Sequence, residues 1–399
     1  MSSPNREMNR TAYADRLDVF QTSLWLEVDA MVDRHPDMIF FGNGGPAKSL
    51  MPADRLAEAT ATVWSEGLDM LTYGETEGYA PLRRLIVEQM AKVNAPAVAE
   101  EILVINGSQE GMDIIGRTLI NPGDVVLVDA PTFPDAVRIY ESHGATVLGM
   151  PMDDEGVIVD DVRAMLDRLP AKPKFIYTIP TFQNPTGVTM SLARRQALVD
   201  LARERDILIV EDDPYSAFRY EGETLPSLRA LDPATVYLGT FSKTLSPGLR
   251  VGWISAPEPL YRQLFGLKEV MHIGNNRIAT RLVYHAANGF IDGHVAWARE
   301  QYRDRRDTLV AALEQYMPAG TKWLVPQGGF FLWVELPERY NTDDLLAAAA
   351  DNGVIFLPGS WFYPGRTKHN AFRLSFSSLD PDLMAEGVRR IRLAIDQAG

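Results

Sequence analysis

Cysteine is missing from this 399-residue chain, which excludes disulfide bonds and thiolate metal sites. Its six histidines show none of the spacings typical of metal ligands, so we expect no bound metal. Basic residues are outnumbered, because 39 Lys and Arg against 53 Asp and Glu give a formal net charge of −14. This acidity disfavours nonspecific binding to nucleic acids and to anionic membranes.

Long apolar runs are missing as well, and no hydrophobic stretch is long enough to span a bilayer. The N-terminus is polar and lacks the pattern of a signal peptide, so we expect a cytoplasmic protein. With 46% hydrophobic and 23% charged residues, the composition is that of an ordinary globular protein. The chain is too long for one ordinary core, which predicts two domains.

The middle of the chain alternates short apolar runs with helical stretches. This pattern predicts an α/β fold with a mostly parallel sheet that helices cover on both faces. A helix is expected from Gln109 to Leu119 and another from Ser191 to Asp206, where Ser191 can cap the first turn. The expected strands are 102–105, 125–128, 175–177, 207–210 and 236–238.

The C-terminal part reads as α+β and predicts a separate, smaller domain. We expect a large domain at residues 53–295 and a small domain at 296–399, with a long helix near 295–316 between them. Residues 1–52 include an apolar helical stretch at 17–32, are too few to fold alone and are expected to dock on the small domain. The expected C-terminal strands are 330–334 and 371–376, and the expected helices are 343–351 and 381–397.

Lys243 stands in segment 240–252, among hydroxyl residues, turn residues and Arg250. Amines form Schiff bases with carbonyl cofactors, and a nearby cation or desolvation lowers the amine pKa enough to make it nucleophilic. Hydroxyls and an arginine suit a phosphate, so the segment indicates pyridoxal 5′-phosphate (PLP), which carries both an aldehyde and a phosphate. The alternative is a structural lysine in a turn.

Polar residues follow the predicted strands of the large domain, and open α/β sheets bind ligands at such strand ends. Ser108 and Gln109 follow the first strand and open a helix, which makes a natural phosphate site. On sequence alone, Ser108 is more simply explained as the helix cap. Phe133 follows the second strand and can stack on a pyridine ring, although a lone aromatic residue is more often part of a core.

Two further strands also end in polar residues. Asn184 lies in an Asn-Pro-Thr-Gly turn. Its amide can donate to a cofactor oxygen, or the turn can serve only to reverse the chain. Glu211, Asp212 and Asp213 end the next strand and can be helix caps or solvated acids. Alternatively, one buried carboxylate can face a pyridine nitrogen and keep it protonated, which makes the ring a better electron sink.

Four motifs resemble, in residue type and order, those of the class I/II aminotransferases of PLP fold type I. They are Asn184-Pro185-Thr186-Gly187, Asp212-Asp213-Pro214-Tyr215, Ser242-Lys243 with Arg250, and the late Arg373. The resemblance is to the 2-aminoadipate and kynurenine aminotransferase branch, and also to the aminotransferase-like half of some bacterial regulators. It covers residues 20–395 and implies a seven-stranded, mostly parallel sheet in the large domain, plus a smaller α+β domain.

The resemblance also implies roles for the motif residues. Lys243 would form the Schiff base with the cofactor and then shuttle the substrate α-proton. Asp212 would pair with the pyridine nitrogen, while Asn184 and Tyr215 would hold the phenolic oxygen. The phosphate would be held by Ser108, Gln109, Thr240, Ser242 and Arg250.

On the substrate side, Arg373 would grip the α-carboxylate with its planar guanidinium. Gly44 and Asn184 would line the substrate pocket, and Phe133 would stack on the cofactor ring. Tyr73 resembles a tyrosine that reaches the phosphate of the partner subunit. The resemblance therefore implies a homodimer with composite active sites.

One departure from the family pattern bears on the substrate. Where 2-aminoadipate enzymes often carry an arginine for a distal carboxylate, this chain has Trp25. Tryptophan cannot pair with a carboxylate but can pack on an apolar or planar group. We therefore expect an L-amino acid with a neutral, aromatic or otherwise non-standard side chain, and a 2-oxo acid as its partner.

Two other functions remain open beside transamination. Enzymes of the same fold that catalyse β- or γ-elimination or replacement begin with the same loss of the α-proton, so the cofactor motifs do not separate the two. A ligand sensor related to the regulators would need an N-terminal DNA-binding domain with a basic surface. The chain is acidic and has little room for such a domain before Gly42.

Overall fold

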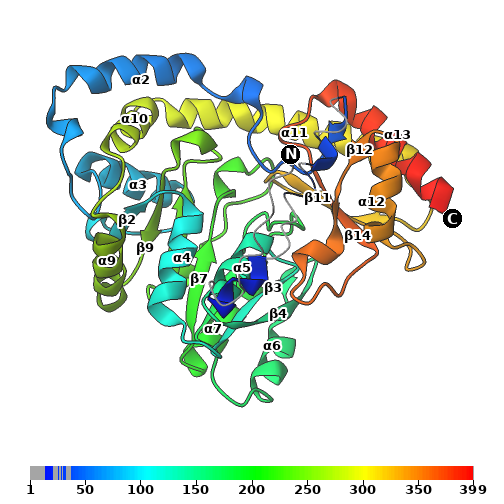
Figure 1. Ribbon diagram of the computed structural model, residues 1–399, viewed down its shortest axis with the longest axis horizontal. Coiled ribbons are helices and arrows are strands. Elements are labelled where there is room, and N and C mark those ends of the chain that lie inside the picture. The colour runs from blue at the N-terminus through cyan, green and yellow to red at the C-terminus, as the bar shows by residue number, and fades with distance from the viewer. Residues whose placement is uncertain (1–13, 21–25, 27, 29, 33–36, 399) are drawn as a thin grey trace, which may run out of the picture.

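The computed structural model describes residues 14–20, 26, 28, 30–32 and 37–398. A larger part built around a sheet and a smaller C-terminal part are joined by the long helix α11 (Ile291–Tyr316), which runs from one to the other (Figure 1). The predicted boundary between residues 295 and 296 falls inside this unbroken helix. Both predicted boundaries, at residues 53 and 296, stay predictions.

The large sheet has eight strands in the described part of the chain. In spatial order they are β2 (Ile102–Ile105), β9 (Gly252–Ser255), β8 (Val236–Thr240), β7 (Leu208–Asp212), β6 (Phe175–Thr178), β3 (Val125–Ala130), β4 (Thr146–Asp153) and β5 (Gly156–Val157). Strands β8 to β4 are parallel, and β9 is antiparallel to both of its neighbours. The prediction of seven strands misses β5, which turns back on β4 because Gly156, at φ +101°, closes a tight turn.

Helices cover both faces of this sheet, as predicted (Figure 1). They include α3 (Ala80–Lys92), α4 (Ser108–Leu119), α5 (Pro134–Ser142), α6 (Val159–Leu166), α7 (Leu192–Glu204), α9 (Glu258–His272) and α10 (Arg277–Ala287). Strand β3 shows why the run 125–128 is apolar: Val126 and Val128 pack in the cluster under α4 and α5, and Leu127 packs in the cluster under α6 and α7. Because both faces are buried, the strands are continuous hydrophobic runs.

The starts of two helices bear on the predictions. The Ser191 hydroxyl caps α7 by accepting from the Arg194 N–H at 3.3 Å, as the sequence predicts. Helix α4 begins one residue earlier than predicted, because Gly107 is its N-cap, with a φ of +88°. Ser108 is therefore the first helical residue, and the reading of it as the cap is wrong.

The C-terminal part confirms the predicted α+β pattern. Its sheet, among the described residues, has the order β10 (Lys322–Trp323), β11 (Phe331–Glu335), β14 (Ala371–Ser375) and β13 (Leu357–Pro358), and its helices are α12 (Thr342–Asp351) and α13 (Pro381–Ala398). One apolar cluster joins α11, α12 and α13 to β11 and β14. Within the described ranges, no helix combines the length and apolarity needed to cross a membrane.

The N-terminal segment contacts both parts, although it was expected on the small domain. Strand β1 (Ile39–Phe40) pairs in parallel with β12 (Val354–Ile355) of the C-terminal part. The 3₁₀ helix η2 (Asp15–Phe20) lies against α5 of the larger part, where the Arg138 guanidinium is 5.3 Å from the Phe20 ring centroid (Figure 1). The expected helix at 17–32 therefore starts as a 3₁₀ helix, and residues 21–25, 27 and 29 of it lie outside the described residues.

Candidate functional site

A cavity of about 270 Å³ opens where the parallel strands of the large sheet end. Its opposite wall comes from β11 and β14 of the C-terminal part. It gathers most of the residues that the sequence singles out: Gly44, Ser108, Gln109, Phe133, Asn184, Asp212, Tyr215, Thr240, Ser242, Lys243, Arg250 and Arg373. Strand ends of a parallel sheet are the expected place for a ligand.

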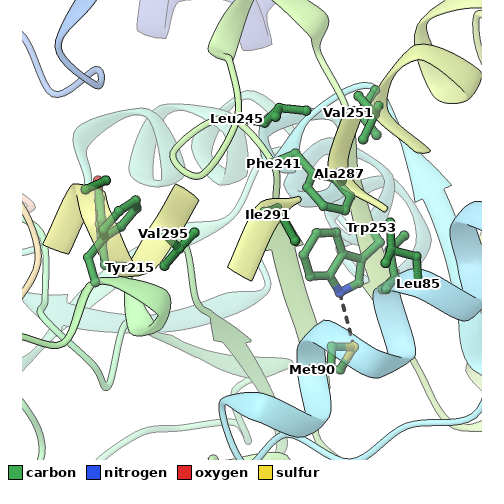
Figure 2. Close-up of a cluster of buried hydrophobic side chains, with 14 of the residues drawn as sticks. Leu85, Met90, Tyr215, Phe241, Leu245, Val251, Trp253, Ala287, Ile291 and Val295 are labelled. Carbon is green, nitrogen blue, oxygen red and sulfur yellow. Dashed lines mark hydrogen bonds between the residues drawn. The ribbon is translucent and has the colours of Figure 1, made fainter. Parts of the chain in front are cut away.

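An apolar cluster holds the turn that carries Lys243 (Figure 2). The Phe241 ring centroid lies 5.2 Å from that of Trp253, and Trp253 Nε1 donates to Met90 Sδ at 3.2 Å. Leu245 belongs to the same buried cluster. Because the apolar side chains of the turn pack here, its polar side chains are left to line the cavity.

Lys243 is half-buried, and its Nζ donates to the Gly44 carbonyl at 3.0 Å. Burial lowers the pKa of the Lys243 amine to about 8. Burial is the largest cause of this shift, the guanidinium groups of Arg373 and Arg250 act in the same direction, and Asp212 opposes them. An amine with such a pKa is partly neutral near pH 7, and the neutral amine is the form that attacks an aldehyde.

Asp212 presents one unpaired oxygen at the end of β7. Its Oδ2 accepts from the Tyr177 hydroxyl at 2.6 Å, whereas the buried Oδ1 has no hydrogen-bond partner in the part of the chain that the structure describes. Burial raises the pKa of this carboxyl to about 7, while the Tyr177 hydrogen bond and Lys243 hold it down. Since buried acceptors without donors are rare, this oxygen indicates a ligand that carries an N–H or O–H group.

Asp213 differs from its neighbour because both of its oxygens are used. Oδ2 accepts from the Tyr237 hydroxyl at 2.7 Å, and Oδ1 accepts from the Ser216 backbone N–H at 3.0 Å. Asp213 is also not among the residues that line the cavity with Lys243. The geometry therefore favours Asp212 as the acid that meets a ligand.

Tyr177 lies in the strand predicted at 175–177, but the sequence gives its hydroxyl no role, although its position carries a signal. It stands on β6, in a strand whose four residues are all buried. A tyrosine buried on such a strand needs a hydrogen-bond partner for its hydroxyl. The identity of that partner depends on the neighbouring strand, which the sequence pattern of β6 does not specify.

The N-terminus of α4 lies beside Arg250 in the wall of the cavity. A side chain at Gly107 would come within 2.3 Å of Arg250 Nη2, so glycine permits this close approach. The Thr240 hydroxyl donates to the Ser242 hydroxyl at 2.9 Å on the same wall as Ser108. Helix N–H groups, hydroxyls and a guanidinium together form a site for an anion such as phosphate.

Gln109 contributes to this wall through its backbone. Its side-chain amide donates to Asp135 Oδ2 at 3.0 Å and is therefore engaged. Its backbone N–H lies in the first turn of α4, where N–H groups have no acceptor within the helix. The backbone N–H is thus the group of Gln109 that can contact an anion.

Arg373 also lines the cavity and is buried. Its Nη1 donates to Asn184 Oδ1 at 2.9 Å, and its Nη2 donates to the Gly42 carbonyl. The guanidinium carbon lies 4.3 Å from the Phe331 ring centroid and 5.1 Å from that of Phe362. Burial lowers the pKa of Arg373 to about 10, which leaves it charged at neutral pH. A fixed planar cation of this kind suits a carboxylate.

Tyr215, Phe133 and Gly44 complete the walls. Burial raises the pKa of the Tyr215 hydroxyl above its usual value, and Lys243 Nζ lies 5.8 Å from the Tyr215 ring centroid. Phe133 is half-buried and directly precedes α5. A side chain at position 44 would come within 2.9 Å of the Phe331 ring, so glycine keeps this part of the cavity open.

Of the described residues predicted for the site, Tyr73 is not among those that line the cavity. Trp25 lies outside the described residues. Tyr73 follows the 3₁₀ helix η4 (Asp69–Leu71) and is 84% exposed. The Arg277 guanidinium binds the carbonyl oxygens of Asp69 at 2.6 Å and Tyr73 at 3.0 Å, so it holds this surface segment.

The groups in the cavity fit pyridoxal 5′-phosphate. The anion site beside Arg250 suits its phosphate, and the unpaired oxygen of Asp212 suits a protonated ring nitrogen. The partly neutral amine of Lys243 suits its aldehyde. Arg373 remains for the carboxylate of an amino acid.

Comparison with known proteins agrees with this chemistry. The family model described as "Aminotransferase class I and II" matches residues 36–391. The aromatic-amino-acid aminotransferase 1 of Thermococcus litoralis is 38% identical over 369 residues, which cover 90% of this chain and 88% of that protein. The 2-aminoadipate transaminase of Thermus thermophilus is 34% identical over 368 residues, which cover 91% of each.

A solved structure agrees as well. The kynurenine aminotransferase of Pyrococcus horikoshii, in complex with PMP, has a TM-score of 0.92 at 34% identity, over 97% of each chain. These comparisons give no support for elimination or replacement chemistry. The chain belongs to the class I and II aminotransferase family and is a pyridoxal phosphate-dependent aminotransferase.

Proposed function

We propose that this enzyme moves an amino group between an L-amino acid and a 2-oxo acid through Lys243, as a cytoplasmic homodimer. When bound, the cofactor supplies an aldehyde that takes up the amino group and a protonated ring that withdraws electrons. The observation that carries the proposal is the unpaired, buried Oδ1 of Asp212 in the same cavity as the Lys243 amine.

Each of the ionisable residues then has one task. Lys243 would hold the cofactor through its aldehyde and would serve as the base for the proton on the substrate α-carbon. Asp212 keeps the ring nitrogen protonated by opposite charge. Arg250 and the first turn of α4 hold the phosphate, with the hydroxyls of Thr240 and Ser242 beside them.

The substrate carboxylate is the proposed partner of Arg373. Its guanidinium is already oriented by Asn184, whose Oδ1 accepts one of the arginine N–H groups. The Nδ2 hydrogens of Asn184 would then be available to donate to the phenolic oxygen of the cofactor. Tyr215 would be a second donor to that oxygen, because its raised pKa keeps the hydroxyl protonated. Phe133 offers a ring face for stacking.

The covalent role of Lys243 is tested by trapping. After borohydride reduction of the loaded wild-type enzyme, we expect peptide mass mapping to find the cofactor on Lys243. Lys243→Ala should lose this adduct and lower kcat roughly 1000-fold or more, because both the nucleophile and the base are gone. Lys92→Ala, at a surface lysine paired with Asp292, is the control and should leave both readouts unchanged. Cofactor trapped on another lysine contradicts the assignment.

Asp212 and Asp213 form a matched pair for testing the electronic role. Asp212→Asn removes the charge that faces the ring nitrogen, and we expect kcat to fall roughly 100-fold or more. Asp213→Asn should lower kcat less than about tenfold, because Asp213 is held by Tyr237 and Ser216 outside the cavity. The measurement is kcat for one amino acid in both variants. Equal losses, or the reverse order, would show that the assignment is wrong.

The proposed dimer is supported by the surface around Tyr73. Apolar side chains gather on this segment and on the end of α9, which are linked because Lys268 on α9 donates to the Thr76 carbonyl. The exposed residues are Leu68, Leu71, Tyr73, Val270 and Ile273. Exposed apolar groups of this kind favour contact with another protein. A second copy of the chain is the partner that would bring Tyr73 to a phosphate.

Subunit mixing tests this arrangement. Tyr73→Phe removes one hydroxyl, and we expect the affinity for the cofactor to fall about tenfold. In a hybrid dimer of one Tyr73→Phe subunit and one Lys243→Ala subunit, one of the two sites has both native residues. The mixture should therefore contain a fraction of sites that bind the cofactor tightly. Tyr316→Phe, in the C-terminal part, is the matched control. The composite site is contradicted if the protein sediments as a monomer and is fully active in that state. It is also contradicted if the mixture contains no sites that bind the cofactor tightly.

The first substrate is proposed to have a neutral or aromatic side chain. Among the described residues that line the cavity, the cations are Lys243, Arg250 and Arg373, and each already has a proposed role. Phe133 and Phe331 offer aromatic walls instead. The names of the Thermococcus litoralis and Pyrococcus horikoshii relatives support the same substrate class.

Substrate competition tests this class. We expect the wild-type enzyme to have a higher kcat/KM for phenylalanine or kynurenine than for 2-aminoadipate, because a side-chain carboxylate would be buried without a partner. Trp25→Arg should shift the ratio of the two kcat/KM values toward 2-aminoadipate by about tenfold, and Trp25→Phe should not. A wild-type preference for 2-aminoadipate over every neutral substrate would contradict this proposal.

A further inference from the structure

Lys268 is a fully buried lysine that the proposed chemistry does not use. It lies on α9, and its ammonium donates to the Thr76 carbonyl and to Asn275 Oδ1, the latter at 2.8 Å. Burial lowers the pKa of Lys268 to about 8, while Glu110 and Glu77 oppose this shift. Lysines are rarely fully buried unless they are paired, so the position of this ammonium calls for a reason.

Two asparagine amides lead from Lys268 to a carboxylate. Because Asn275 Oδ1 accepts from the ammonium, its Nδ2 faces Asn106 Oδ1, at 3.2 Å. Asn106 Nδ2 then donates to Glu110 Oε1 at 3.0 Å. The two amides lie head to tail between a cation and an anion, and the charges at both ends fix which way each amide faces.

This amide relay (Lys268, Asn275, Asn106 and Glu110) includes the residue before the anion site, Asn106. The Asn106 N–H donates to Glu110 Oε2 at 2.5 Å, and its carbonyl accepts from Arg250 Nη2 at 3.4 Å. Both backbone groups and both ends of the Asn106 side chain are therefore held. Asn106 directly precedes Gly107, so its orientation sets the direction in which the chain enters the first turn of α4.

The other hydrogen bond of Lys268 reaches the segment that carries Tyr73. Thr76 stands three residues beyond Tyr73, and its carbonyl accepts from the Lys268 ammonium. Arg277 holds the same segment at the Tyr73 carbonyl. The buried ammonium of Lys268 thus donates hydrogen bonds in two directions, to Asn275 of the relay behind the anion site and to the segment that carries the exposed Tyr73.

We propose that Lys268 is a positioning residue for phosphate binding. Through the amide relay it orients the anion site of its own subunit, and through Thr76 it orients the Tyr73 that its subunit offers to the partner. The proposal rests on the proposed function, in which α4 and Arg250 hold the cofactor phosphate and Tyr73 reaches the phosphate of a second copy.

Two variants and two ligands distinguish a selective effect on phosphate binding from a general loss of stability of the fold. Asn275→Leu breaks the relay but leaves Lys268 bonded to Thr76, whereas Lys268→Met removes both bonds. The dissociation constants of the apoenzymes are measured in phosphate-free buffer for pyridoxal 5′-phosphate and for pyridoxal, which lacks the phosphate. Lys92→Met is the control, because its surface ammonium pairs with Asp292 on α11. Thermal unfolding of each apoenzyme checks that it is folded.

For Asn275→Leu we expect the affinity for pyridoxal 5′-phosphate to fall roughly tenfold, as supporting residues behind a ligand site do elsewhere. The affinity for pyridoxal should stay unchanged. Lys268→Met should show the same selective loss and also dimerise more weakly in sedimentation experiments, whereas Lys92→Met should match the wild type.

Equal losses for the two ligands, or unchanged affinity for pyridoxal 5′-phosphate in Asn275→Leu, would overturn the proposal. If Lys268→Met does not fold, Asn275→Leu decides by itself. A wild-type protein that binds neither ligand would instead overturn the proposed function, and this proposal with it.

Discussion

Two ionisable groups of opposite charge, the half-buried Lys243 and the buried Asp212, line one cavity, and much of the structure serves to keep them there. Burial disfavours the charged form of both groups and brings their pKa values to about 8 and about 7. Each group depends on a fixed neighbour. The Tyr177 hydroxyl supports the carboxylate, and the Gly44 carbonyl accepts from the amine. An amine that can be neutral and an acid that can be charged are the forms that PLP chemistry needs.

The large sheet and its apolar layers hold these groups in place. Strands β6 and β7 are parallel, with Tyr177 opposite Val210, so that the hydroxyl comes within reach of Asp212 at the end of β7. The cluster around Trp253 does the same for the turn that carries Lys243 (Figure 2). A rigid scaffold matters here because catalytic groups must keep their positions closely to remain effective.

The walls of the cavity come from different parts of the fold. The larger part contributes Lys243, Asp212 and the anion site, and the C-terminal part contributes Arg373 from β14. Asn184 joins the two sides, because its Oδ1 orients Arg373 across the cavity. A substrate that bridges Arg373 and Lys243 therefore contacts both parts at once, and α11 joins those parts through one continuous helix (Figure 1).

The α/β alternation, the helix start at Ser191 and the kinds of groups at the strand ends follow from the sequence alone, because they depend on local periodicity and turn chemistry. Which of these groups remain available to a ligand follows from long-range packing. It engages the Gln109 side chain with Asp135, leaves one oxygen of Asp212 unpaired, brings Tyr177 beside it and places η2 against α5. Such choices depend on contacts between residues far apart in the chain, such as Arg373 with Asn184, and no local pattern records them.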